Sequence, residues 1–168
     1  MKIVVHKKGF TLIEALVALV LLTMTLGPIL YFASSSADIA TSVINNVIAA
    51  NLAQEGVEVI RAIRDSNYFA EVAFDTGLPA GTFEVQWDSQ PPLAATIGIP
   101  QYLKIDSTGA VGTTGLYNYG SGIDTPFIRL VTITKVSAIE LKITSSVTWT
   151  ERSRNRSVEV EDHLYDWK

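Results

Sequence analysis

The chain has 168 residues, a formal net charge of -4 and no cysteine. This length allows one modest domain beside a membrane segment, and an acidic balance gives no general reason to expect nucleic-acid binding. Without cysteine the chain can form neither disulfides nor cysteine-type zinc sites, so an exported domain must rely on its hydrophobic core.

A nearly uncharged apolar segment follows the basic N-terminus. Residues 10–33 contain one charged residue, Glu14, and as a helix they are long enough to cross a bilayer core, which needs about 20 residues. A carboxylate near the centre of a membrane helix costs roughly 2.5–3.5 kcal/mol, and less near an end, so Glu14 needs a partner or a function. Cleavage after Gly9 would free an amine on Phe10, four residues before Glu14 on one helical face. We therefore expect Glu14 to pair with the Phe10 amine of the same or a neighbouring copy.

The residues around this point form the run Lys7-Lys8-Gly9-Phe10-Thr11-Leu12-Ile13-Glu14. Followed by an apolar helix, this run closely resembles the prepilin signal of type IV pilins and type II secretion pseudopilins. The resemblance implies cleavage by prepilin peptidase between Gly9 and Phe10, N-methylation of Phe10, and a role for Glu14 in assembly onto a filament. It also implies other pilin or pseudopilin subunits, an inner-membrane platform protein and an assembly ATPase as partners.

Two simpler interpretations of the N-terminus are an ordinary secretory signal and an uncut membrane anchor. A secretory signal would combine the basic start with the apolar residues 15–22 and a cleavage site within residues 33–37. A glutamate at the start of the apolar core and a span of this length both fit such a signal poorly. Under every interpretation Lys2, Lys7 and Lys8 hold the N-terminus in the cytoplasm, which predicts a single pass through the cytoplasmic membrane and an external C-terminal domain.

The apolar segment is predicted to continue as a long helix. Pro28 removes a backbone donor late in the membrane segment, so we expect a break or a loosening of the helix there. Residues 34–67 contain no proline and carry apolar side chains at helical spacing. Arg61, Arg64 and Asp65 predict a solvated end of this helix.

Two apolar stripes run along residues 34–67. One stripe contains Ile39, Val43, Ala50, Ala53, Val57 and Ile60, and the other contains Ile44, Ile48, Leu52, Val59 and Ile63. A helix packed only against its own domain needs one stripe. Two stripes predict that the domain's sheet covers one side and that neighbouring helices cover the other. The alternative is a helix buried deeply within a single monomer.

The composition changes after residue 68 to short apolar runs separated by glycine, proline, serine and threonine, which predicts loops and strands. Strands are predicted at residues 82–88, 102–106, 116–119, 127–135, 139–150 and 158–164. In residues 139–150 Ile139, Leu141, Ile143, Val147 and Trp149 alternate with polar side chains, as in an antiparallel strand with one wet face.

These elements predict an α+β, pilin-like fold, in which a long N-terminal α-helix packs on a C-terminal antiparallel β-sheet. The family resemblance implies the same fold. We divide the chain into a leader (1–9), a transmembrane and assembly helix (10–33), an amphipathic continuation (34–67) and an exported β-sheet domain (68–168).

Catalytic and metal-binding patterns are sparse. His6 would leave with the leader, so His163 is the histidine of the mature chain, and no nucleophile-elbow sequence is present. We therefore predict no enzymatic activity and no cofactor. Asp75, Asp106 and Asp124 could hold calcium in loops, as in some major pseudopilins, but EF-hand spacing is absent and loop aspartates commonly cap turns. No metal site is predicted.

Three arginines, Arg152, Arg154 and Arg156, alternate with polar residues at a predicted hairpin tip. Exposed arginines can contact the phosphates of DNA. The acidic residues nearby favour instead a solvated turn with cross-strand ion pairs, and we prefer this interpretation.

The resulting hypothesis is a structural subunit, a minor pilin or pseudopilin, of a type IV pilus or type II secretion-like filament, extracellular or periplasmic. The segments 147–151 and 164–168 resemble minor subunits of the PilV or GspI type. The alternative hypothesis is a signal-anchored or secreted binding domain, such as an adhesin or a DNA-uptake subunit, that is not built into a filament.

Overall fold

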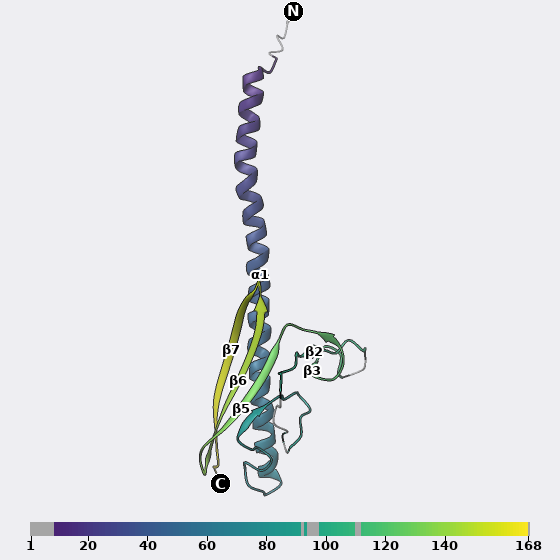
Figure 1. Cartoon of the computed structure of the whole chain (residues 1–168), viewed down its shortest axis with the longest axis vertical. Helices are drawn as coiled ribbons and strands as arrows, with labels where there is room; N and C mark the ends of the chain where they lie inside the picture. The colour runs from purple at the N-terminus through teal and green to yellow at the C-terminus, as the bar shows by residue number, and fades with distance from the viewer. Residues whose placement is uncertain (1–8, 92, 94–97, 110–111, 168) are drawn as a thin grey trace, which may run out of the picture. The chain divides into compact units, whose positions relative to one another are not determined.

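The structure is a computed structural model that describes residues 9–91, 93, 98–109 and 112–167. His6 and the leader lysines Lys2, Lys7 and Lys8 lie outside the described residues. Internal contacts divide the chain into two compact units, Met1–Val43 and Ile44–Lys168. Helix α1 (Leu12–Phe69) contributes to both units, and all the described strands follow it (Figure 1).

Helix α1 begins immediately after Thr11. The backbone N–H of Glu14 donates to Thr11 Oγ1 over 3.3 Å, and the N–H of Ala15 donates to the Thr11 carbonyl over 3.1 Å. A threonine at the N-cap with a glutamate three residues later is the sequence of a capping box. The side chain of Thr11 therefore fixes where the helix starts.

Helix α1 continues through Pro28 to Phe69, so the expected break at Pro28 is not present in this chain. Proline has a backbone φ that suits a helix, and it removes only one backbone donor. In the preceding turn the hydroxyls of Thr23 and Thr25 donate to the carbonyls of Val20 and Leu21 over 2.9 and 3.0 Å. The turns on either side of the missing bond keep the helix continuous.

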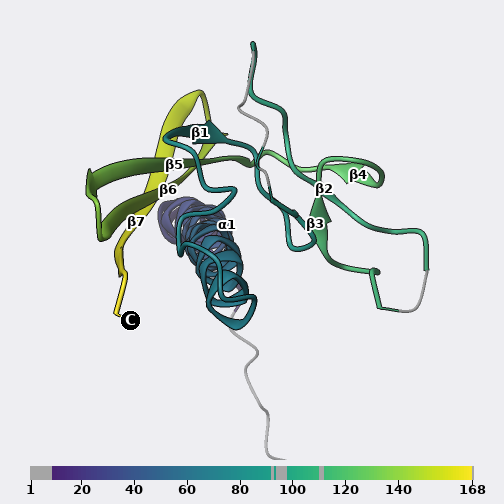
Figure 2. The same cartoon turned by 90° about the horizontal axis from the view of Figure 1, so that it is seen from below.

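The second unit contains two antiparallel sheets and the later portion of α1. The larger sheet has the order β1 (Gly81–Phe83), β5 (Ile128–Ser137), β6 (Glu140–Glu151), β7 (Arg154–Tyr165). The smaller sheet has the order β3 (Tyr117–Asn118), β2 (Lys104–Ile105), β4 (Ile123–Asp124). Figure 2 shows the larger sheet curving over one side of α1. The predicted α+β fold, with one long N-terminal helix and a C-terminal antiparallel sheet, is confirmed.

Strand β6 shows the predicted alternation, with two differences. Its first residue is Glu140, so Ile139 lies before the strand and is exposed. Ser145 occupies a fully buried position on the apolar face. A Cβ placed on Gly56 of α1 would lie 2.5 Å from Ser145 Oγ and 2.9 Å from Val131 Cγ2. The helix approaches the sheet so closely here that a side chain at position 56 would collide with β5 and β6.

Strands β6 and β7 are joined by a two-residue turn, Arg152-Ser153. The predicted strands at residues 139–150 and 158–164 had left a longer connection between them. Both turn residues have positive φ, 49° and 61°. This is the backbone of the tight hairpin turns that match the twist of the flanking strands, although such turns usually contain Asn-Gly. Residues 154–157 are therefore part of β7 and not of a loop.

The predicted strand at residues 82–88 is much shorter, because β1 ends at Phe83. Beyond this point the side chains of Glu84 and Gln86 accept hydrogen bonds from the backbone N–H groups of Gln101 and Tyr119, over 2.6 and 2.9 Å. These bonds attach the segment to the loops around the smaller sheet, and the segment no longer follows β5.

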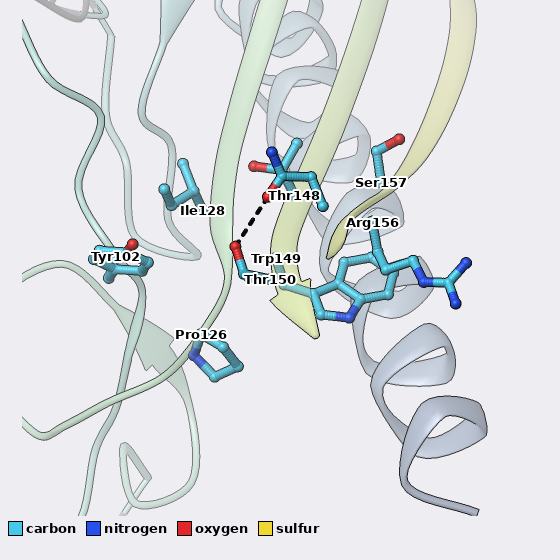
Figure 3. A pocket seen from close by; sticks show the side chains of 9 residues that line it. Tyr102, Pro126, Ile128, Thr148, Trp149, Thr150, Arg156 and Ser157 are labelled. Atoms are coloured by element: carbon cyan, nitrogen blue, oxygen red, sulfur yellow. Dashed lines mark hydrogen bonds between the residues drawn. The ribbon is translucent and has the colours of Figure 1, made fainter. Parts of the chain in front are cut away.

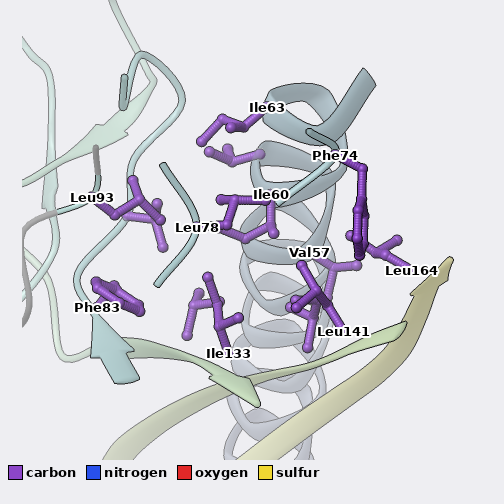
Figure 4. Close-up of a cluster of buried hydrophobic side chains, with 14 residues drawn as sticks. Val57, Ile60, Ile63, Phe74, Leu78, Phe83, Leu93, Ile133, Leu141 and Leu164 are labelled. Carbon is purple, nitrogen blue, oxygen red and sulfur yellow. The ribbon is translucent and has the colours of Figure 1, made fainter. Parts of the chain in front are cut away.

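Both apolar stripes of α1 are buried inside the same domain from Leu52 onward. Val57 and Ile60 of one stripe share a core with Val59 and Ile63 of the other (Figure 4). The residues that cover them belong to the larger sheet and to the segment between α1 and β2: Phe74, Leu78, Phe83, Val85, Leu93, Val131, Ile133, Leu141, Ile143 and Leu164.

The expectation that neighbouring helices cover the second stripe is therefore wrong for this portion of α1, where the monomer buries both stripes. The second stripe is buried by the segment between Phe74 and Leu93. The apolar residues of this segment are scattered through loops, so they form no periodic pattern in the sequence. Upstream, Ile39, Val43 and Ile44 are 62%, 56% and 58% exposed. These earlier positions remain available to other chains.

Arg64 was expected at a solvated helix end but is only 5% exposed. Its Nε donates to Asp65 Oδ1 over 2.7 Å, and its guanidinium lies 4.1 Å from the ring centroid of Trp167. Tyr68 also contacts the Trp167 ring, at a centroid distance of 4.7 Å. The C-terminal tail therefore covers the end of α1, a contact between distant regions of the chain that helical spacing does not encode.

Candidate functional site

The bond between Gly9 and Phe10 lies outside any helix or strand. Phe10 is 75% exposed, and among the described residues no atom beyond the chain neighbours of Gly9 lies within 4 Å of a Cβ placed on it. Because α1 starts only at Leu12, the backbone at this bond is not tied into helical hydrogen bonds. A peptidase can bind such a segment in an extended conformation without unfolding an element.

The portion of α1 that follows is apolar and exposed on every side. An 18-residue window within the helix has a mean hydropathy of 2.2, and none of it is buried within the chain. Leu16, Leu19 and Met24 point in different directions around the helix and are 55%, 62% and 71% exposed. A helix that is apolar all round needs lipid or other protein around it. Because none of this window is buried, the early portion of α1 is not a core helix within the described chain.

Glu14 lies in the first turn of α1, where a negative charge interacts favourably with the helix dipole. Among the described residues no cation pairs with its carboxylate. Phe10 precedes the helix, so the uncut chain does not place Phe10 and Glu14 one turn apart on α1. That arrangement requires α1 to gain a turn at its start once the leader is removed.

A family model for the prokaryotic N-terminal methylation motif matches residues 5–30. The chain carries the prepilin-type signal of type IV pilins and pseudopilins. No curated protein and no solved structure matches the chain. The prepilin-type signal belongs to structural, non-enzymatic proteins, and it implies processing by prepilin peptidase, association with pilin subunits and anchoring in a membrane.

The prepilin-type signal covers Gly9, Phe10, Glu14 and Pro28, the residues singled out in the sequence. Sequence reasoning did not identify Thr11 as the residue that ends the accessible segment. The Thr-x-x-Glu spacing of residues 11–14 carried this information. Its effect is to keep the Gly9–Phe10 bond outside the helix.

The loop aspartates serve as turn caps and ion-pair partners. Asp106 accepts a hydrogen bond from the Thr108 N–H over 2.8 Å, and this bond holds the pKa of the Asp106 carboxyl below its usual value. Asp75 lies 2.7 Å from Lys135 Nζ, and Asp124 lies 3.9 Å from Lys104 Nζ. In the stretches of the chain that the structure describes, no three histidine or acidic side chains form a metal-binding group.

His163 of β7 lies on the solvated face of the larger sheet. Its Nδ1 is 2.6 Å from Glu140 Oε1, and the hydroxyl of Tyr165 donates to the same oxygen over 3.0 Å. The hydrogen bond to Glu140 raises the pKa of His163. These contacts connect β6 to β7 and do not include a serine or threonine nucleophile.

A groove of about 410 Å³ lies beside the end of β6 (Figure 3). It is lined by Tyr102, Pro126, Ile128, Thr148, Trp149, Thr150, Asn155, Arg156 and Ser157. Thr150 Oγ1 donates to Asn155 Oδ1 over 3.1 Å. The described lining offers hydroxyl and amide groups without a carboxylate or histidine that could serve as a general base.

The three arginines of the β6–β7 hairpin lie at its solvated end. Arg152, Arg154 and Arg156 are exposed, and the Nε of Arg156 is 4.0 Å from Glu151. Of the acidic residues further along β7, Glu161 pairs with Lys142 at 2.6 Å and Asp162 pairs with Arg61 at 2.7 Å. The Glu151–Arg156 pair connects β6 to β7, in agreement with a solvated turn that carries a cross-strand ion pair.

Proposed function

We propose that this chain is a structural subunit, a minor pilin or pseudopilin, of a type IV pilus or type II secretion-like filament. The observation that supports the proposal is the position of the signal in the structure. The prepilin-type signal falls on a segment whose Gly9–Phe10 bond is accessible and whose following helix is apolar and exposed on every side. In this proposal prepilin peptidase cuts after Gly9, and Phe10 is then methylated.

Cleavage would create a charged partner for Glu14, which has none among residues 9–91, 93, 98–109 and 112–167. In the uncut chain the nitrogen of Phe10 is a peptide amide, which has no charge. After cleavage it becomes an amine, and an amine from the same or a neighbouring copy neutralises Glu14 in apolar surroundings. Only processed chains then enter a helix bundle at low cost, since an unpaired carboxylate in an apolar medium is expensive.

The apolar segment at residues 10–33, which includes the early portion of α1, acts in this proposal as membrane anchor and as assembly surface. The N-terminus lies in the cytoplasm and the domain outside the cytoplasmic membrane, by the positive-inside rule. Movement from lipid into a bundle of like helices keeps these side chains in apolar surroundings. A head-to-tail contact of this kind does not close, so it builds an extracellular or periplasmic filament. The assembly ATPase and the platform protein act as partners, and the subunit has no catalytic activity of its own.

The test is substitution of Glu14 in the full chain produced in its own cells. Glu14→Ala leaves the cleavage site intact but leaves the amine unpaired, so we expect normal cleavage and at least about a tenfold loss from the sheared filament fraction. Glu159→Ala removes an exposed carboxylate of β7 and serves as the control, with no expected loss. Unchanged incorporation of the Glu14 variant would remove the charge-pairing mechanism.

A further inference from the structure

Two residues near the proposed cleavage site could serve as the N-cap of α1. The structure uses Thr11, whose Oγ1 accepts a hydrogen bond from the backbone N–H of Glu14 over 3.3 Å. Gly9 lies two positions earlier, and glycine ranks close to threonine as an N-cap residue. The choice between them decides where the helix begins, because the N-cap immediately precedes the first helical residue.

The two possible helix starts place the Gly9–Phe10 bond in different backbone conformations. With Thr11 as the N-cap the helix starts at Leu12, and Gly9 and Phe10 both remain outside it. With Gly9 as the N-cap the helix would start at Phe10, and the bond to be cut would join the cap to the first helical residue. A peptidase could then bind this segment in an extended conformation only after the first turn had opened.

The hydroxyl of Thr11 is what favours the later start. Without it the side chain at position 11 offers no oxygen to a free backbone N–H, and Phe10 and Leu12 offer none either. Glycine ranks well above such apolar residues as an N-cap, so the start should move toward Phe10. Space for the longer helix is present, because Phe10 is 75% exposed and, among the described residues, no atom beyond the chain neighbours of Gly9 lies within 4 Å of a Cβ placed on it.

We infer that Thr11 is a positioning residue for cleavage by prepilin peptidase. Its hydroxyl holds the start of α1 at Leu12 and thereby keeps the Gly9–Phe10 bond in a conformation that the peptidase can bind. The inference rests on the proposed cut between Gly9 and Phe10. Thr11 acts through the backbone of α1 and takes no part in breaking the bond.

A role of this kind changes KM and leaves kcat unaltered. If the peptidase binds only chains whose helix starts at Leu12, the apparent affinity falls in proportion to the fraction of such chains. Loss of an N-cap side chain shifts the helix equilibrium by about two- to fivefold. A chain that has bound presents the same extended segment as before, so the chemical step keeps its rate.

The test is the initial rate of cleavage of the full-length precursor by the prepilin peptidase of its own cells, in detergent micelles. Thr11→Val removes the hydroxyl and keeps the branched shape, so KM should rise about two- to fivefold at unchanged kcat. Thr11→Ser keeps a hydroxyl at this position and should restore the KM of the parent chain.

Thr25→Val is the matched control within the same helix. The hydroxyl of Thr25 donates to the carbonyls of Leu21 and Leu22, over 3.0 Å each, and caps no helix start. This variant loses a threonine hydroxyl from α1 as Thr11→Val does, but it should leave both KM and kcat unchanged.

The position of the helix start can be measured without the peptidase. In the same precursors the carbonyl-carbon chemical shift of Phe10 should have a non-helical value in the parent chain and in Thr11→Ser. In Thr11→Val it should move toward the helical value. This measurement distinguishes a change in the helix start from the loss of a direct contact between Thr11 and the enzyme.

Three results would overturn the inference: an unchanged KM in Thr11→Val, an equal rise in Thr11→Ser and Thr11→Val, or a fall in kcat at constant KM. The last would mean that Thr11 contacts the peptidase in the transition state. Glu14→Ala separates these results from the proposed function, because it keeps the backbone N–H that Thr11 binds and should be cut like the parent chain. If the parent precursor is not cut between Gly9 and Phe10, the proposed processing fails and the inference fails with it.

Discussion

The early portion of α1, residues 12–33, and its later portion, residues 44–69, are both rich in apolar side chains, but only the later portion buries them within the chain. Between residues 12 and 33 every residue is exposed. Between residues 44 and 69 the larger sheet and the segment from Phe74 to Leu93 cover both apolar stripes from Leu52 onward. An apolar helix pattern therefore indicates that the helix must be buried against something. Whether it is buried within its own molecule depends on the residues that the rest of the chain places against it.

The later portion of α1 is also held by polar contacts that the early portion lacks. Arg129 of β5 is fully buried and donates to the carbonyls of Leu52 and Val85. Asn67 donates to the carbonyls of Phe74 and Thr76 over 3.0 and 2.9 Å. These contacts tie the helix to both of its covering layers.

Arg129→Met should have the largest effect on the stability of the domain. The variant leaves two buried carbonyls unpaired and removes the cation beside Glu55, so the free energy of unfolding should fall by about 3–5 kcal/mol. Urea unfolding of the full chain in detergent micelles, followed by tryptophan fluorescence, measures it. Arg154→Met is the control, because Arg154 is exposed and its loss should cost about 0.5 kcal/mol or less. Equal losses in both variants would refute a special role for the buried arginine.

The two glycines of α1 provide a matched pair for the comparison. A Cβ on Gly56 meets Ser145, Val131 and Arg129, whereas a Cβ on Gly27 meets nothing within 4 Å. Gly56→Ala should therefore destabilise the domain by about 1–3 kcal/mol through overpacking. Gly27→Ala should leave the domain's unfolding midpoint unchanged. A neutral Gly56→Ala would mean that the sheet can move away from the helix at little cost.

The smallest expected effect is the contribution of His163, on the solvated face of the sheet, to the pH dependence of stability. Its hydrogen bond to Glu140 raises the pKa of His163, so the protonated form stabilises the folded chain. This contribution is fully present below the unfolded pKa, about 6.5, and it is lost as the pH rises through the higher folded pKa. The pKa of Glu140 is lowered by the same bond, so the contribution of Glu140 is lost only as the pH falls through that lowered value.

The pH prediction is measured as the urea midpoint of the full chain at pH 5.5 and pH 8.5. In the parent chain the urea midpoint should be lower at pH 8.5 than at pH 5.5. In His163→Gln the difference between the two midpoints should be smaller. Identical pH profiles of the two proteins would show that this contact does not affect stability.

Local patterns in the sequence were enough for the helix, the alternation of β6 and the prepilin-type signal, because each depends on residues close together in the chain. The burial of Arg64 was not predictable in this way, since it depends on Trp167 about a hundred positions later. Arg129 left a readable signal, because alternation along β5 places it on the same face as Val131 and Ile133. An arginine at an inward position indicates buried acceptors, even though their identity depends on the fold.

The start of α1 shows the same distinction within the candidate site. Gly9, Phe10 and Glu14 were identified from their order in the sequence. The uncut chain nevertheless begins its helix two residues after Phe10, because Thr11 caps it. In the proposed mechanism the motif supplies Phe10 and Glu14, whereas their pairing would depend on a chain terminus that is created only by cleavage.

The intact mass of the mature protein tests the central claim most directly. The account predicts a chain that starts at Phe10 and carries one additional methyl group, with the fragment at the N-terminus locating that group on the Phe10 nitrogen. A mature chain that starts near Asp38 would show an ordinary secretory signal instead, and it would contradict the proposed anchoring and assembly through α1.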